Sequence, residues 1–113
     1  MDLTNQKEKV EFAEKSVDFF IAHKERKASF KEMISSNSTN YDRHFTSTSK
    51  FSLVIENAGG RFSGGRATVW GTSTDQYDID IMHMVLGEIE GNVIIIIEKL
   101  DGNYTRRSEI TIQ

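Results

Sequence analysis

The 113-residue chain contains no cysteine. It therefore has no disulfide framework, no thiolate zinc cage and no cysteine nucleophile. Its longest uninterrupted aliphatic run is Val93 to Ile97, far short of the roughly 20 residues that a membrane helix needs. The first residues, MDLTNQKEKVEF, are too charged for a signal peptide. These absences predict a cytoplasmic protein with no membrane partner.

A basic excess is also lacking, because the formal net charge is −3. Neutralisation of phosphates dominates nucleic-acid affinity and favours a basic surface. We therefore do not expect nucleic acid as a partner. The composition, 37% apolar and 27% charged, is that of one soluble domain that buries a single core.

The first third of the chain, residues 4–35, has helical patterns. Asn5 with Glu8 matches a capping box, and Ser29 with Glu32 matches a second one. We predict a long helix followed by a short one. Apolar residues at helical spacing predict the core face of the long helix: Val10, Ala13, Val17, Phe20 and Ile21. Phe12 and Phe19 form a second, narrower seam on roughly the opposite side.

Residues 36–49 are rich in Ser, Thr and Asn, which favour turns, and we predict a connector there. Residues 50–113 alternate apolar and polar side chains as strands do, for example along a single predicted strand from Tyr77 to Val85. Short glycine turns at Glu90-Gly91-Asn92 and Asp101-Gly102-Asn103 predict hairpins. About five strands in this order favour an antiparallel meander.

These elements predict one α+β domain. One or two N-terminal helices pack on a curled antiparallel sheet of about five strands, a cone or half-barrel. The order of the elements, with helices first and antiparallel strands after them, resembles that of the nuclear-transport-factor-2 and cystatin-like folds. Such folds include both enzymes and binding modules, so the resemblance leaves the function open.

The stretch NAGGRFSGGRATVW, residues 57–70, suggests three structures: a phosphate loop, an arginine-glycine nucleic-acid segment, or a turn followed by a bulge. A phosphate loop needs a lysine, a hydroxyl and a following helix, none of which is present at the required spacing. Arginine-glycine segments that bind RNA are long and repeated. The favoured interpretation is a turn at Asn57 to Gly60 and a bulge or bend at Gly64-Gly65.

Two charged groups have predicted partners or roles. Glu98 should face an arginine across the last hairpin, Arg107 with a two-residue loop and Arg106 with a three-residue loop. His83 shares the face of the predicted strand that contains Tyr77, and burial there would suit a general base assisted by Asp80 or Tyr77. A core histidine bonded to a backbone carbonyl is the competing interpretation.

No metal site and no cofactor are predicted. His23, His44 and His83 lack the close ligand pairs that make a metal signal specific. Asp78 and Asp80 project from one side of a strand, but no third converging ligand is evident, so a solvated face is favoured.

Apolar residues occupy both faces of the predicted sheet, and one helical layer cannot cover both. Three arrangements would bury them: a deeply curled sheet filled by its own helix, a sheet around a small-molecule cavity, or a face docked on another chain. The residues that we expect on a partner or ligand surface are Asp78, Asp80, Met82, Met84, Leu86, Ile94 and Ile96.

We therefore expect a non-catalytic binding or accessory protein of inhibitor, immunity or adaptor type, with a homodimer or another protein as partner. Its apolar and acidic sheet surface would make the contact. The alternative is a cone-shaped protein or enzyme for a small apolar ligand, with His83 as general base.

Overall fold

The computed structural model describes residues 2–23, 25–36, 40–48, 50–70, 76–80, 83–101 and 103–113. These residues form helix α1 (Gln6–Ala22) and two antiparallel sheets. The five-stranded sheet has the order β2-β1-β8-β7-β6, with the bounds β1 Ala28–Ser35, β2 Asn40–Thr48, β6 Met84–Glu90, β7 Val93–Lys99 and β8 Thr105–Ile112. The three-stranded sheet has the order β3-β4-β5, with the bounds β3 Lys50–Ala58, β4 Arg61–Trp70 and β5 Gln76–Asp80.

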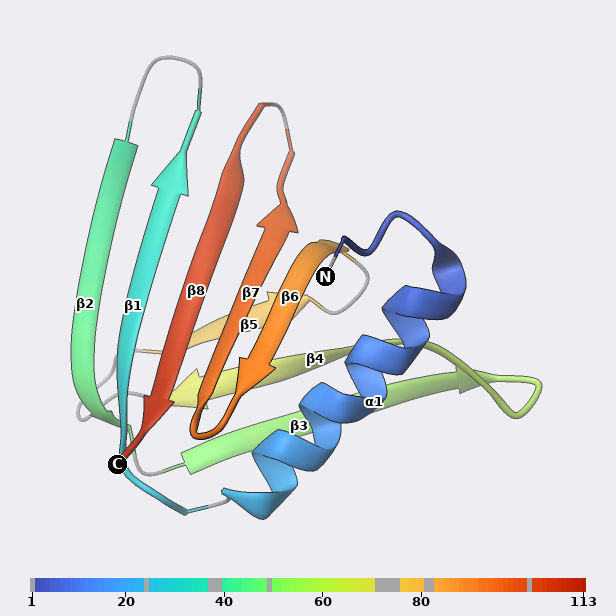
Figure 1. Cartoon of the computed structure of the whole chain (residues 1–113), viewed down its shortest axis with the longest axis horizontal. Coiled ribbons are helices and arrows are strands. Elements are labelled where there is room, and N and C mark those ends of the chain that lie inside the picture. Colours follow the sequence, from blue (N-terminus) through green and yellow to red (C-terminus); the bar gives the residue numbers. More distant parts are fainter. Residues whose placement is uncertain are drawn as a thin grey trace.

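The predicted α+β fold, with an N-terminal helix packed on an antiparallel sheet, is confirmed. The strands of the three-stranded sheet run crosswise to those of the five-stranded sheet (Figure 1). Core side chains come from α1, β4 and β5 and from β1, β6, β7 and β8. The helix and the smaller sheet therefore cover the same face of the five-stranded sheet, which we call the inner face; the opposite one is the outer face.

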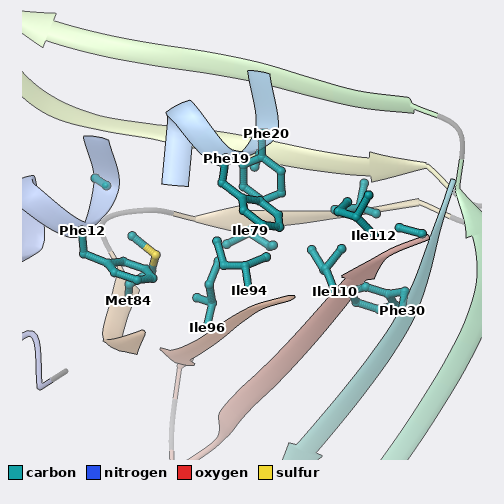
Figure 2. Close-up of a cluster of buried hydrophobic side chains, with 14 of the residues drawn as sticks. Phe12, Phe19, Phe20, Phe30, Ile79, Met84, Ile94, Ile96, Ile110 and Ile112 are labelled. Carbon is teal, nitrogen blue, oxygen red and sulfur yellow. The ribbon is translucent and has the colours of Figure 1, made fainter. Parts of the chain in front are cut away.

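Helix α1 begins as predicted, because the side chain of Asn5 accepts a hydrogen bond from the backbone N–H of Lys7. Its core face includes Ala13 and Phe20, as predicted, but it is centred on the second seam of Phe12 and Phe19. The buried residues are Phe12, Ala13, Ser16, Phe19 and Phe20, whereas Ile21 is 62% exposed. The seam of large aromatic rings therefore faces the core, since each ring buries more apolar area than a valine. Figure 2 shows Phe12 beside Met84, and Phe19 and Phe20 above Ile79 and Ile94.

The predicted second helix and the predicted connector are both wrong. Ala28–Ser35 is strand β1, paired with β8 on one side and with β2, Asn40–Thr48, on the other. Ala28, Phe30 and Glu32 are buried on alternate positions of β1. The charged residue at a buried position hides the alternation in the sequence. Strand β2 ends the sheet, and edge strands are typically polar.

The single strand predicted from Tyr77 to Val85 is also wrong. Strand β5 ends at Asp80 and β6 begins at Met84, and the two belong to different sheets. The chain thus passes from the three-stranded to the five-stranded sheet between these residues. Alternation along β5 does not continue into β6, so the predicted inward face that joined Ile79 to His83 does not exist.

The glycine-rich stretch forms the predicted turn, and it forms a bulge at Ser63, one residue before the predicted Gly64-Gly65. Gly59 and Gly60, at φ 60° and 77°, connect β3 to β4, and positive φ values at both positions are typical of a tight hairpin turn. The pairing of β3 with β4 shifts register between Glu56, opposite Gly64, and Asn57, opposite Phe62. The stretch is therefore one hairpin, with a strand on each side of its turn.

Glu98 and Arg106 connect the two sheets. They are cross-strand neighbours on β7 and β8, which selects one of the two predicted pairings. Arg106 donates to both carboxylate oxygens of Glu98, at 2.9 Å each. Its guanidinium also donates to the backbone carbonyl of Asp78, at 2.5 Å, while Glu98 accepts from the backbone N–H of Asp80, at 2.9 Å. The ion pair therefore satisfies the edge of β5 that does not face β4.

Candidate binding surface

The side chains of strand β7 divide between the two faces of the five-stranded sheet. Ile94, Ile96 and Glu98 are buried on the inner face. Val93, Ile95 and Ile97, at the alternate positions, are only partly buried. Successive strand residues point to opposite faces, so these three lie on the outer face. Within the described residues, no helix or strand covers that face.

Strand register places further apolar side chains beside those of β7. Ile97 lies opposite Leu86 of β6 and Arg107 of β8, and Arg107 lies opposite Met33 of β1. Leu86 is 38% exposed and Met33 46% exposed. This row therefore presents apolar groups on β6, β7 and β1, with the charged Arg107 of β8 between the last two.

Three of the four residues in the next row are charged. Ile95 lies between Glu88 of β6 and Glu109 of β8, and Glu109 lies opposite Lys31 of β1. Glu88 and Lys31 are both exposed. Arg107 donates to Glu109, two residues along β8, at 3.1 Å, which confirms that both project from the outer face. The described outer positions of β1, β6, β7 and β8 include three cations, Lys31, Lys99 and Arg107, and three anions, Glu88, Glu90 and Glu109.

A hollow of about 300 Å³ lies on this surface beside β6. It is lined by Glu88, Glu90, Val93 and Ile95. Two carboxylates therefore border an aliphatic floor. Such a hollow fits a long cationic side chain, whose methylene stem packs on apolar groups while its charge reaches the carboxylates.

A second hollow, of about 350 Å³, lies between α1 and β6. It is lined by Phe12, Lys15, Gly87, Glu88 and Ile89. Phe12 packs directly on the strand here, because a Cβ atom on Gly87 would lie 2.2 Å from the ring. Neither hollow is lined by His83 or Asp80.

The predicted general base is exposed. His83 and Asp80 side chains are 53% and 41% exposed, with 3.7 Å between Nδ1 and Oδ2. The pair is a surface ion pair when the imidazole is protonated. Burial of His83, whether as a general base or as a core histidine, is therefore wrong. Of Tyr77, only the backbone position on β5 is described.

The seven residues expected on one partner or ligand surface do not share a surface. Met84, Ile94 and Ile96 are core residues. Asp78 and Asp80 lie on the three-stranded sheet, where Asp78 accepts a hydrogen bond from Thr68 at 2.5 Å. Leu86 lies on the outer face of the five-stranded sheet, and Met82 is outside the described residues.

The sequence missed Ile95, Ile97 and Met33 as surface residues. Strand β7 offers isoleucine to both faces, so composition alone does not indicate which face is inward. The predicted pairing of Glu98 with an arginine was a usable signal. A carboxylate that satisfies a buried strand edge places Ile94 and Ile96 inward with it, and Ile95 and Ile97 outward.

Among residues of the described ranges, no three His, Asp or Glu side chains are grouped as metal ligands. Helix α1, in the part of the chain that the structure describes, is not long and apolar enough to cross a membrane.

The fold is similar to that in the crystal structure of the Bacillus subtilis YojF protein. The TM-score is 0.58, over 88% of this chain and 89% of that chain, with 8% sequence identity. At this identity the similarity concerns the fold alone. Neither protein-family models nor curated proteins give a match to the chain.

Proposed function

We propose that this protein is a small non-catalytic binding protein that docks another protein chain on the outer face of its five-stranded sheet. The observation that supports the proposal most is the group of apolar side chains at the outer positions of β6, β7 and β1. An apolar surface bordered by polar groups is typical of a protein interface, and here Arg107 of β8 separates the β1 side chain from the apolar patch on β6 and β7. The members of the group are Leu86, Val93, Ile95, Ile97 and Met33.

The chemistry of the other candidate groups favours binding over catalysis. A general base needs a substrate held within hydrogen-bonding reach. The His83–Asp80 pair is largely exposed, and it lines neither hollow. The charged residues of the outer face, in contrast, surround apolar groups and give a contact its orientation.

Native mass spectrometry of gently purified protein tests the proposal. We expect species heavier than one chain, which are lost in Ile95→Lys and retained in His83→Ala. Ile95 lies between Glu88 and Glu109, so a lysine there gains two carboxylate neighbours and leaves the fold intact while it interrupts the apolar surface.

Circular dichroism of both variants is the control for folding. A monomer that carries a small-molecule adduct, together with loss of that adduct in His83→Ala, would contradict the proposal and support a ligand-binding protein or enzyme. Heavy species that survive Ile95→Lys would place the contact elsewhere on the molecule.

A further inference from the structure

The outer face is complementary to itself. The sheet order is β2-β1-β8-β7-β6, and the outer side chains that the structure describes lie on β1, β8, β7 and β6. The midline of these four strands lies between β7 and β8. Glu88 on β6 and Lys31 on β1 lie in one row of the register, at equal distances from the midline and with opposite charges. Leu86 and Met33 occupy the matching positions of the neighbouring row and are both apolar.

We infer that the outer face binds the outer face of a second copy of this chain, about a two-fold axis parallel to the strands and above the line between β7 and β8. This inference rests on the proposed function, because it names the partner of the same surface. Such an axis places β6 over β1 of the partner subunit. Each row of residues across one sheet then lies over the same row of the partner subunit. The strands of the two sheets are then aligned, the common arrangement for sheets packed face to face.

The axis brings opposite charges together twice. Glu88 faces Lys31 of the partner subunit, and Lys31 faces Glu88 of the partner subunit. Leu86 likewise faces Met33 of the partner subunit, so the apolar ends of the first row cover one another. An isologous contact of this kind is closed and ends at the dimer.

The hollow beside β6 provides a place for the lysine. Its lining of Glu88, Glu90, Val93 and Ile95 lies over β1 of the partner subunit in this arrangement. The stem of Lys31 of the partner subunit packs on the two aliphatic side chains, and its ammonium group reaches the two carboxylates.

The balance of charge also favours a second copy. The outer positions of β1, β6, β7 and β8 have three cations and three anions, although the whole chain has a net charge of −3. A strongly acidic or basic partner would match such a face poorly. Arg107 and Glu109 are already paired within each protomer, so the contact leaves neither charge uncompensated.

The size of the face indicates a dimer of moderate affinity. Four strands about 4.8 Å apart, each about seven residues long, form a face of roughly 500 Å². Two such faces bury about 1,000 Å² in total, close to the lower limit for a specific interface. We therefore expect dissociation at micromolar concentrations.

Charge exchange tests the arrangement. In sedimentation experiments over a concentration series, Glu88→Lys alone and Lys31→Glu alone should each raise the dimer dissociation constant at least about tenfold, because both contacts become repulsive. An equimolar mixture of the two variants should recover the wild-type dissociation constant, since both contacts are again between opposite charges. Glu14→Lys, an exposed change of the same charge on α1, is the matched control and should have no effect.

Disulfide trapping gives an independent readout, because the chain has no cysteine of its own. A mixture of Leu86→Cys and Met33→Cys should form a disulfide-linked dimer under mild oxidation. Each variant alone should form little, since the axis keeps two copies of the same residue apart on opposite sides of the dimer.

The possible results separate this inference from the proposed function. A wild-type protein that sediments as a monomer at all concentrations, or variants that fail to complement, would overturn the two-fold dimer. If a complex with a different protein then appears in native mass spectra and is lost in Ile95→Lys, the proposed function survives without the dimer. If neither complex forms, both are wrong.

Discussion

At the scale of single residues, Phe12 packs closely against Gly87. A Cβ atom on Gly87 would lie 2.2 Å from the ring of Phe12. The Phe12 side chain is almost completely buried. Alanine normally stabilises a strand position relative to glycine. Gly87→Ala should instead lower the free energy of unfolding by about 1–3 kcal/mol, the usual cost of overpacking. Urea denaturation, monitored by circular dichroism, measures this change in the free energy of unfolding.

A second substitution separates crowding from backbone effects. Phe12→Leu removes ring atoms that the new methyl group would meet, so Gly87→Ala should cost less in that background than in the wild type. Additive costs in the double variant would show that the ring is not the cause.

Residue-level prediction from the sequence succeeded where chemistry restricts the choice. Asn5 caps the helix because its side chain can accept from the first turn, and Glu98 pairs with one of the two predicted arginines. The residue-level prediction failed for the core face of α1, where several apolar residues satisfy the same helical spacing. Val10 and Phe12 are both apolar at helical spacing, and only the shape of the space between the sheets selects the aromatic seam.

At the scale of elements, the ion pair of Glu98 and Arg106 holds strand β5 against the five-stranded sheet. Glu98 is fully buried, and Glu32, 3.7 Å from the Arg106 guanidinium, is almost so. Arg106→Met removes the charge that compensates two buried carboxylates and the donor to the Asp78 carbonyl. We expect it to lower the free energy of unfolding by about 3–5 kcal/mol, measured by urea denaturation.

The matched variant is Arg106→Met combined with Glu98→Gln. The amide removes one buried charge, and its oxygen can still accept from the backbone N–H of Asp80. The double variant should therefore be more stable than Arg106→Met alone. Equal stability of the two, or a cost below about 1 kcal/mol for Arg106→Met, would show that the ion pair does not hold the sheets together.

The same ion pair explains why elements were harder to predict than the fold class. The alternation along β1 is interrupted in the sequence by Glu32, which is buried because Arg106 lies beside it. The alternation from Tyr77 to His83 appears continuous, although the chain changes sheets after Asp80. Both errors arise from contacts between residues distant in sequence, which local periodicity does not contain.

At the scale of the whole molecule, α1 and the smaller sheet cover one face of the larger sheet, and the described chain leaves the other uncovered. The sequence predicted that one helical layer cannot cover both faces of the sheet, because apolar residues occupy both faces of β7, and it left open three ways to bury the second face. It did not predict the second sheet, and the predicted meander order is wrong, because β1 pairs with β8, the last strand of the chain. If the uncovered face pairs with a second copy, folding and association are coupled.

This coupling makes stability depend on concentration. Each tenfold rise in protein concentration adds about 1.4 kcal/mol to the unfolding free energy of a dimer. A dimer of this size changes its thermal midpoint by roughly 2–4 °C per kcal/mol. We therefore expect the midpoint of the wild type to rise by about 3–6 °C per tenfold increase once the dimer predominates, in thermal scans followed by circular dichroism. Glu88→Lys should show this rise only at concentrations at least about tenfold higher, because its dimer dissociation constant is raised by at least about that factor. A concentration-independent midpoint for the wild type would contradict the dimer, and the same rise in both proteins would indicate an association that does not use the outer face.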